Sequence, residues 1–420
     1  MSRKKKKNNY KKVIIVLLFI IILIISFAII KPKFKKSSNS KNENVMITLD
    51  DLEKAKKFSD DKNIDLNIKY EYSDTVSKDK IISQSIEKGR KLDGIKSIDI
   101  VVSLGKLDKE KLASDNINEL GNVPIMMYHG IINKSSSETN YTGGNVDKDG
   151  YNRTVEAFRE DLEFYYKNNY RMIRLKDYID GKIDTEYGKS PLIITFDDGN
   201  DNNIKVNGLD SDGNIIIDEN SAVGVLESFK KKYPDYKVTA TFFVNGGLFN
   251  QDEYNEKIVK WLVDNGYDVG NHTETHLDIK KSSSDRVQKE IAVVYDKLDK
   301  IIPGKYVKII ALPFGSPYNK DNENFKYVLN GTYNNISYET EGCLRVGWEA
   351  EVSPFNKSFD KTFMKRIRAY DNNGKDFDIK MNFDLLKNKR YISDGNVNTI
   401  ITSSSNESIV NSRDLEVIYY

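Results

Sequence analysis

The sequence predicts an α/β protein whose main part is a distorted (β/α) barrel, preceded by a small α+β module and one transmembrane helix. Three observations lead to this prediction. Residues 122–420 alternate short β-rich runs with helical stretches, which indicates a parallel sheet covered by helices. Residues 44–105 hold one helix-like stretch and three short β-rich runs. Residues 13–30 are apolar except for Ser26, which is enough to span a bilayer.

The N-terminus favours a retained membrane anchor. Residues 1–12 form a strongly basic tail, which favours keeping that end in the cytoplasm. A cleavable signal peptide is the alternative, but the apolar stretch continues beyond the only small-residue site, "SFA". We therefore expect a single-pass protein of the cell membrane, with residues 31–43 as a polar linker and the catalytic part outside the cell.

The charge of the chain is unevenly distributed. Residues 1–41 hold 12 of the 65 Lys and Arg residues and no acidic residue, so the remainder carries 53 basic residues against 63 acidic ones. An acidic body lacks the clustered positive charge that phosphate contacts need, so we expect no nucleic-acid partner. The single cysteine, Cys343, excludes an internal disulfide and is expected to be a buried apolar residue. The sequence does not indicate an oligomeric state.

The module at 44–105 resembles a PASTA domain, the extracellular module of cell-wall enzymes and kinases. The matching residues are Ala55, residues 73–85, Gly89, Gly94 and residues 100–105. Ile86 stands where that family usually has proline, and Asp79 where glycine is common. The resemblance implies either wall binding or a spacer. A second polar linker is expected at 106–121.

The domain at 122–420 is built from alternating elements. We expect strands at 123–128, 170–175, 191–196, 237–244, 267–271, 305–314, 343–348 and 397–402. We expect helices at Val155–Lys167, Ala222–Lys232, Glu256–Asn265 and Asp285–Ile302. Residues 200–220 interrupt the alternation with a turn-rich insertion, predicted to be a small hairpin or flap. In a closed barrel the first strand would lie beside the last.

The chemistry-bearing residues follow strand ends. Asp197 and Asp198 follow the strand at 191–196, His129 follows the first strand, and His272 and His276 follow the strand at 267–271. The carboxyl ends of barrel strands open on one face, so these side chains are expected to meet. Two histidines and one carboxylate form a metal site with open positions, and the second carboxylate can act as general base. Taken alone, "DDG" could be a turn and the two histidines a solvated loop.

The motifs resemble those of the NodB-homology polysaccharide deacetylases, carbohydrate esterase family 4. "TFDDG" (195–199), "TATFFVNG" (239–246) and "NHTETH" (271–276) carry the resemblance. It implies a barrel of the polysaccharide deacetylase type with Asp197 as catalytic base. It also implies that Asp198, His272 and His276 bind a divalent metal, expected to be Zn²⁺, with Co²⁺, Ni²⁺ or Mn²⁺ as alternatives.

One departure from the family concerns the arginine that orients the base. The third motif reads "ALPFG", so Ala311 replaces this arginine, and Arg345, Arg366 or Arg368 are the candidates to supply it. Pro313, Phe314 and Gly315 remain as substrate-binding residues, and the Phe314 N–H is the matching oxyanion donor. Trp348 is expected either to stack on a sugar or to belong to the core.

The other departure concerns the general acid. No histidine follows His276, so the late general acid of the family is absent. "VPIMMYHG" resembles the opening of exopolysaccharide-type deacetylases, which makes His129 the candidate acid. A structural role for His129, hydrogen-bonded beside the pocket, is the alternative.

Together these features predict a metal-dependent N-deacetylase that removes acetyl groups from N-acetylated amino sugars of cell-wall peptidoglycan. One alternative is a deacetylase of secreted poly-N-acetylglucosamine. Another is a non-catalytic surface protein that binds sugars, for which the loss of arginine at Ala311 is the argument. The partners implied are a wall or surface polysaccharide as substrate, and the membrane through the N-terminal helix.

Overall fold

The computed structural model describes residues 49–92 and 94–420. Within these ranges no helix is both long and apolar enough to cross a membrane. The expected basic tail (1–12), transmembrane helix (13–30) and first linker (31–43) lie outside the described residues. The anchor therefore stays a prediction from the sequence.

The N-terminal module is α+β, as expected. Helix α2 (Leu52–Lys62) begins at Asp51, whose side chain accepts a hydrogen bond from the Lys54 N–H, and ends at Asn63 in the left-handed region. Strands β1 (Asp65–Glu71), β2 (Ile81–Gln84) and β3 (Ser97–Ser103) form a sheet in the order β1-β3-β2.

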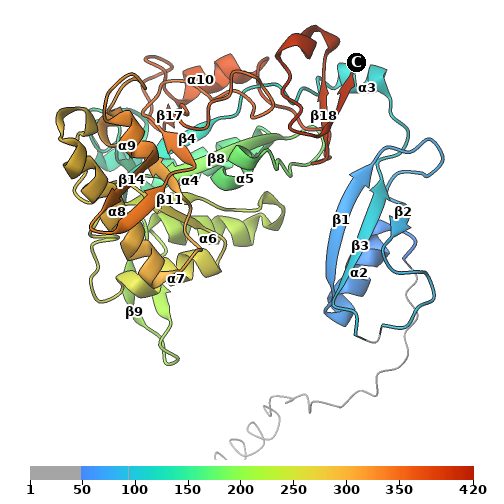
Figure 1. Ribbon diagram of the computed structural model, residues 1–420, viewed down its shortest axis with the longest axis horizontal. Helices are drawn as coiled ribbons and strands as arrows, with labels where there is room; N and C mark the ends of the chain where they lie inside the picture. The colour runs from blue at the N-terminus through green and yellow to red at the C-terminus, as the bar shows by residue number, and fades with distance from the viewer. Residues whose placement is uncertain (1–48, 93) are drawn as a thin grey trace, which may run out of the picture. The chain divides into compact units, whose positions relative to one another are not determined.

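A curled parallel sheet forms the centre of the large domain (Figure 1). Its strands run in the order β16-β13-β12-β11-β8-β4-β17, and β7 pairs with the beginning of β8. The strands are β4 (Ile125–Tyr128), β7 (Tyr170–Met172), β8 (Ser190–Phe196), β11 (Thr241–Val244), β12 (Asp268–Asn271), β13 (Ile309–Ala311), β16 (Gly342–Leu344) and β17 (Ile367–Arg368). Every residue of β8 is buried, because a parallel strand is covered on both faces.

Four long helices pack around this sheet at the positions that the sequence predicts (Figure 1). They are α4 (Val155–Lys167), α6 (Ala222–Lys232), α7 (Asn255–Asp264) and α8 (Ser284–Ile301). Thr154, Ser221 and Ser283 cap α4, α6 and α8 by accepting a backbone N–H in the first turn. The predicted ends of all four helices agree with the structure to within one residue.

Shorter elements complete the large domain. Its other helices are α3 (Lys109–Ser114), α5 (Leu175–Asp180), α9 (Phe325–Leu329) and α10 (Ile379–Leu386). The antiparallel hairpins are β9 (Val206–Leu209) with β10 (Ile215–Ile217), and β14 (Asn330–Tyr333) with β15 (Ile336–Glu339). Strands β5 (Ile131–Ile132) and β6 (Arg153–Thr154) form a short parallel pair. The hairpin predicted in the insertion at 200–220 is confirmed.

The segment expected as the second linker is structured. Residues 106–121 include α3, and Leu112, Ile117 and Leu120 are buried. Ile117 and Leu112 pack with Ile401 and Ile418 near the C-terminus. The sequence predicted a linker because polar residues surround these three apolar side chains, so no apolar periodicity is visible.

The closure of the barrel differs from the prediction. Residues 397–402 were expected to supply the last strand, but β18 (Thr399–Thr402) pairs instead with β19 (Glu416–Tyr419) in a separate sheet. Strand β17 takes the place beside β4. Just before β17, the chain also runs along β16, the strand at the opposite edge of the sheet. There the Met364 N–H donates to the Cys343 carbonyl, and the Met364 carbonyl accepts from the Arg345 N–H. Residues 361–368, which we call the seam segment, therefore connect the two edges of a half-barrel.

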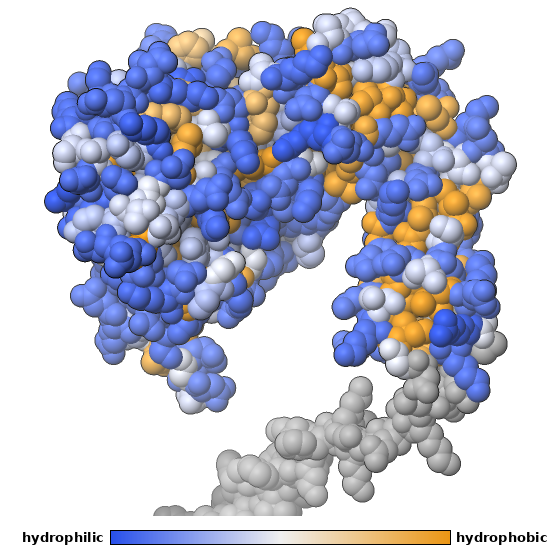
Figure 2. Space-filling view, viewed as in Figure 1, coloured by the Kyte–Doolittle hydropathy of each residue, from blue (hydrophilic) through white to orange (hydrophobic). Residues whose placement is uncertain are grey.

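Four other predicted strands are clearly shorter than expected. The strands predicted at 170–175 and 237–244 are limited to β7 and β11. The strand predicted at 305–314 is limited to β13, because residues 313–315 form a 3₁₀ turn. The strand predicted at 343–348 ends at Leu344. Cys343 is buried, as predicted. The face of the large domain seen in Figure 2 is mostly hydrophilic, as expected for its charged composition.

Candidate active site

The two adjacent aspartates at the end of β8 face different partners. Asp197 is 2% exposed and continues the pairing with β4 through a bond from its N–H to the Tyr128 carbonyl. Asp198 turns into the left-handed region with a φ of 74°. Gly199 follows at a φ of 61°, and a Cβ there would lie 2.1 Å from the Leu248 carbonyl oxygen. This turn therefore requires glycine and separates the two carboxylates.

A buried arginine holds Asp197. The Arg366 guanidinium donates to both oxygens of Asp197, at 2.7 and 2.6 Å, and to the Thr195 hydroxyl at 3.2 Å. Burial alone would raise the pKa of Asp197, but the charge and the hydrogen bonds of Arg366 outweigh it and lower that pKa. Of the three arginines considered as substitutes at Ala311, Arg366 is the one that contacts the carboxylate. The seam segment thus places the arginine that the third motif lacks.

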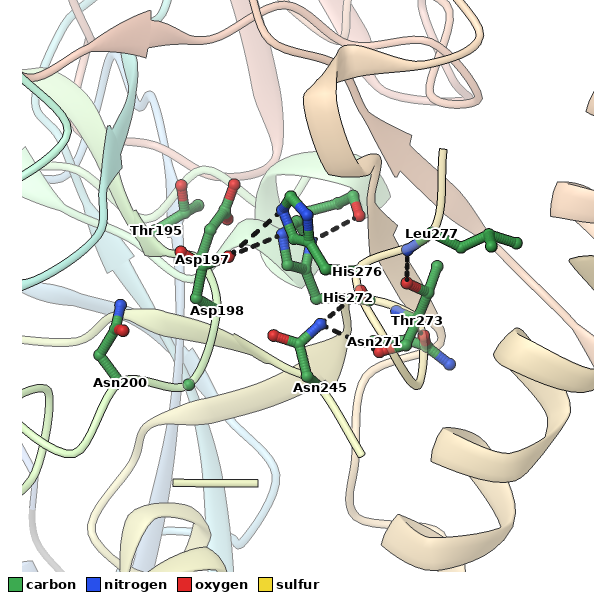
Figure 3. A network of polar contacts seen from close by, with 12 residues as sticks. Thr195, Asp197, Asp198, Asn200, Asn245, Asn271, His272, Thr273, His276 and Leu277 are labelled. Atoms are coloured by element: carbon green, nitrogen blue, oxygen red, sulfur yellow. Dashed lines mark hydrogen bonds and ion pairs between the residues drawn. The ribbon is translucent and has the colours of Figure 1, made fainter. Parts of the chain in front are cut away.

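Asp198 and the two histidines form a cluster that could hold a metal ion. The His272 and His276 Nε2 atoms lie 3.3 and 3.5 Å from Asp198 Oδ1, and Figure 3 shows the three side chains converging. Ligand atoms about 2.0–2.2 Å from a tetrahedral Zn²⁺ are separated by similar distances. The cluster therefore has the chemistry and spacing for a divalent cation.

The tautomer of His272 suits the same role. Its Nδ1 lies 2.8 Å from the Ala311 carbonyl oxygen, an interaction in which Nδ1–H donates. The Nε2 lone pair then points towards Asp198, and this atom is buried without a hydrogen-bond partner. A buried imidazole nitrogen without a partner is costly, and a bound cation would satisfy it.

Helix α8 and strand β11 hold the loop that carries both histidines. The Asn245 side chain, next to β11, donates to the His272 and Thr273 carbonyls at 2.8 and 3.0 Å (Figure 3). Glu290 on α8 accepts from the Thr275 N–H at 2.7 Å and from its hydroxyl at 2.8 Å. His276 has a φ of 56°, so this polar network stabilises a backbone conformation that is unfavourable for histidine.

His129 lies beside this centre. Its carbonyl accepts a hydrogen bond from the Asn203 side chain at 2.7 Å, and its ring meets the Tyr151 ring edge-on at 4.9 Å. Its Nδ1 is buried without a hydrogen-bond partner. Burial lowers the pKa of His129, and the charges of Asp197 and Asp198 oppose this shift.

The Pro313–Gly315 turn and Trp348 provide exposed surface. Phe314 is 56% exposed at a φ of 57°, and its ring contacts His276 edge-on at 4.4 Å. The turn bonds the N–H groups of Gly315 and Ser316 back to Leu312 and Pro313, and the Phe314 N–H is not one of these donors. Pro313 and Gly315 are buried. Trp348 is also 56% exposed, so it does not belong to the core.

The sequence did not single out several residues that support the site. Thr195 contacts Arg366, Asn203 holds the His129 backbone, Tyr151 packs on the His129 ring, and Glu290 holds the histidine loop. Thr195 could have been noticed, because it faces the same side of β8 as Asp197. The other three lie on loops or helices whose approach to the site depends on tertiary structure.

Comparison with known protein families gives two matches. Residues 184–329 match the family described as polysaccharide deacetylase, and residues 47–104 match the PASTA domain. The three residues that could hold a metal lie within the first match, whereas His129 and Arg366 lie outside it.

Two curated proteins are similar to this chain over a limited length. The peptidoglycan-N-acetylmuramic acid deacetylase PdaA of Bacillus subtilis is 31% identical over 116 residues, covering 28% of this chain and 38% of that protein. An uncharacterized 30.6 kDa protein of Geobacillus stearothermophilus is 31% identical over 113 residues, covering 27% of this chain and 34% of that protein. The chain thus spans little more than a third of the curated relatives that it matches.

A solved structure, the Streptococcus pyogenes deacetylase PplD in complex with acetate, is similar over 62% of this chain and 97% of that one. The identity is 19% and the TM-score 0.44.

Proposed function

Since the chain contains a polysaccharide deacetylase domain and a PASTA domain, we propose that it is a metal-dependent N-deacetylase of N-acetylated amino sugars in cell-wall peptidoglycan. The observation that carries the proposal is the pairing of Asp197 with Arg366 next to the Asp198, His272 and His276 cluster. The name of the Bacillus subtilis relative, a peptidoglycan-N-acetylmuramic acid deacetylase, supports peptidoglycan as the substrate.

Asp197 is assigned the role of general base. A divalent cation held by Asp198, His272 and His276 would supply Lewis-acid activation of water and of the acetamide carbonyl. Asp197 remains ionised because Arg366 lowers its pKa, and it accepts the proton of the attacking water. The bidentate contact fixes the carboxylate plane, so its remaining lone pairs point in a defined direction.

Two further groups act on the substrate. The Phe314 N–H, in the turn after β13, donates to the oxygen on which negative charge develops. His129, protonated, donates a proton to the departing amine as the carbon–nitrogen bond breaks. Burial lowers the pKa of His129, and the charges of Asp197 and Asp198 offset part of that shift. The support for this role is its place directly after the first strand, with the unpartnered Nδ1 beside the two aspartates. Exposed Phe314 and Trp348 provide faces on which a sugar ring can stack.

These contacts favour one of the two alternative functions over the other. A catalytically inactive sugar-binding protein was suggested by the missing arginine at Ala311, but Arg366 now fills that place. Deacetylation of a secreted poly-N-acetylglucosamine uses the same chemistry and remains the second candidate. It is favoured by the position of His129 directly after the first strand of the domain.

We further propose that the protein is anchored in the cell membrane by residues 13–30, with its catalytic domain outside the cell. The apolar stretch and the basic residues before it support this location. The PASTA domain would then lie between membrane and catalytic domain, as a wall-binding module or a spacer.

Mass spectrometry of peptidoglycan and of chitooligosaccharides after incubation with the full chain tests the proposal. We expect loss of acetyl groups from peptidoglycan, abolished by a chelator and restored by added Zn²⁺. Asp197→Asn is the matched inactive control, because it keeps the metal-binding residues. Activity that persists in chelator would contradict the metal dependence, and deacetylation of chitooligosaccharides alone would favour the second candidate.

A further inference from the structure

Arg368 is a cation beside the active site that pairs with no other side chain of the described residues. Its side chain makes no hydrogen bond or ion pair with these residues, and its Nε is buried without a partner. Its guanidinium instead lies over two aromatic rings, 3.9 Å from the centroid of Tyr370 and 5.5 Å from that of Tyr151. An arginine that is held in place but unpaired can bind an anion at little conformational cost.

The seam segment places Arg368 near the reacting groups. Arg366 and Arg368 flank Ile367 in an extended segment, so both side chains point to the same face of the sheet. Arg366 reaches Asp197 from this face. Arg368 is two residues closer to the carboxyl end of the sheet, where the site opens. The Tyr151 ring that it covers also packs against His129.

Arg368 is one of the residues that line a polar cavity of about 370 Å³. Tyr141, Asn145 and Lys148 are among its lining residues, which can donate hydrogen bonds to a sugar. Three acidic residues, Asp149, Asp371 and Asp376, also line it. Asp371 and Asp376 accept hydrogen bonds from Asn373 and Asn372 in their own turn. An anionic group is therefore favoured beside Arg368 rather than throughout the cavity.

We infer that Arg368 binds a carboxylate of the substrate and selects amino sugars that carry one close to the acetamide. This inference rests on the proposed deacetylase function. In N-acetylmuramic acid, the acetamide and the lactyl ether are on neighbouring ring carbons. Only the Tyr151 ring separates Arg368 from His129, the candidate general acid. Arg368 is therefore placed to bind the lactyl carboxylate while the acetamide is at the reacting groups. A carboxylate on a stem peptide is the other source of the same chemistry.

Substrates that differ only in charge test this inference. With the full chain, kcat/KM is compared for glycans with a free lactyl carboxylate, with the neutral lactyl carboxamide, and with a stem peptide. Arg368→Gln should lower kcat/KM for the carboxylate glycan about 10- to 100-fold, the value of a charge-assisted hydrogen bond. It should leave the carboxamide glycan nearly unchanged. A selective loss for the stem-peptide glycan would assign the peptide carboxylate instead.

Arg390→Gln is the matched control. Arg390 also lies over a tyrosine ring, at 5.3 Å from Tyr170, and its Nε is also buried without a partner. It contacts the Asn168 carbonyl and no residue of the candidate site. An equal loss on charged and neutral glycans in Arg368→Gln would overturn the inference and give Arg368 a structural role.

A binding measurement separates this inference from the proposed function. Calorimetry with Asp197→Asn protein should show tighter binding of the carboxylate glycan than of the carboxamide glycan, and Arg368→Gln should remove the difference. If the wild type deacetylates none of the glycans, the proposed function fails, but the binding difference still decides the role of Arg368. Equal binding of both glycans would overturn the inference.

Discussion

Arg366 supplies the contact to Asp197 that the third motif, with Ala311 in place of arginine, cannot make. Its side chain is fully buried, and both of its terminal nitrogens contact the Asp197 carboxylate. Removing one partner of a buried ion pair leaves the other charge uncompensated, which costs about 3–5 kcal/mol. Position 366 is therefore expected to affect both turnover and stability.

Arg366→Lys tests the positioning role. Lysine keeps the charge but cannot form the bidentate contact, so we expect kcat to fall roughly 10²-fold, the effect of misplacing a reacting group. Metal affinity, measured by titration, should change little because Arg366 is not a ligand. Arg345→Lys, which alters a side chain over the Phe363 ring, is the comparison variant. If both substitutions reduce kcat equally, the contact between Arg366 and Asp197 has no special role.

His129 leads to a prediction for the pH profile. A general acid must be protonated, so the rate should fall as pH rises through its pKa in the complex. Burial lowers this pKa from the ordinary value of about 6.5, so the falling limb should lie on the acidic side of neutrality. His129→Ala should remove the limb and reduce turnover about 10²–10⁴-fold. Aryl acetate esters, whose leaving group needs little protonation, should be largely spared; an unaltered profile would leave His129 a structural role.

At the scale of elements, α8 controls the loop with the two histidines. Glu290 is fully buried and binds Thr275 through both carboxylate oxygens, and the α8 carbonyl of Ile291 accepts from the Asn271 side chain. The helix therefore fixes a loop in which Thr273 and His276 have positive φ values. None of these contacts involves a ligand atom directly.

Glu290→Ala should weaken metal binding from a distance. Loss of a group that orients metal ligands typically lowers affinity 10–100-fold, and we expect a decrease of this size in Zn²⁺ titrations. Asp296→Ala, on the same helix but paired with Lys300 on its surface, should leave the affinity unchanged. If Glu290→Ala keeps full Zn²⁺ affinity, the conformation of the loop that carries His272 and His276 does not depend on Glu290.

The elements also show what sequence reasoning can reach. The four long helices and the hairpin at 206–217 have clear apolar periodicity or turn signals, and their positions were predicted correctly. Strand β17 was missed because it has only two residues, Ile367 and Arg368, which are too few to show an alternating β pattern. It is a strand because β4 supplies its hydrogen-bond partners.

The site was predictable to a similar degree. Asp197, Asp198, His272 and His276 follow strand ends in the sequence, and the structure brings them together as expected. The identity of the arginine was left among three candidates, because its choice depends on how the seam segment crosses between β16 and β4. Spacing along the chain does not contain that information.

At the scale of the whole molecule, a buried pair of carboxyl groups, Glu119 and Asp394, joins the start of the large domain to its end. Burial raises the pKa of Asp394 to about 6 and raises that of Glu119 well above its ordinary value. Tyr391 and the Ile401 N–H donate to the Glu119 carboxylate at 2.9 and 2.8 Å. Two carboxyl groups this close favour sharing a proton.

This pair predicts that the protein is more stable at mildly acidic pH. The folded state holds a proton on Asp394 up to about pH 6, whereas the unfolded chain releases it near its ordinary value of 3.8. The free energy of unfolding should therefore decrease as pH rises from about 4 to 6, by up to roughly 3 kcal/mol. Denaturant titrations at several pH values measure this slope. Asp394→Asn should flatten it, and an unchanged slope would assign the effect to other groups.

The position of the seam segment in the chain has a consequence for the order of synthesis. The candidate acid and both aspartates are made early, and the histidine cluster follows, but the counter-ion of Asp197 is made only when residue 366 is reached. Until then the buried carboxylate lacks its partner and β4 and β16 have open edges. A nascent or prematurely ended chain thus has the metal-binding residues but lacks Arg366, which positions Asp197. Deacetylation is expected to begin only after nearly the whole polypeptide has been made.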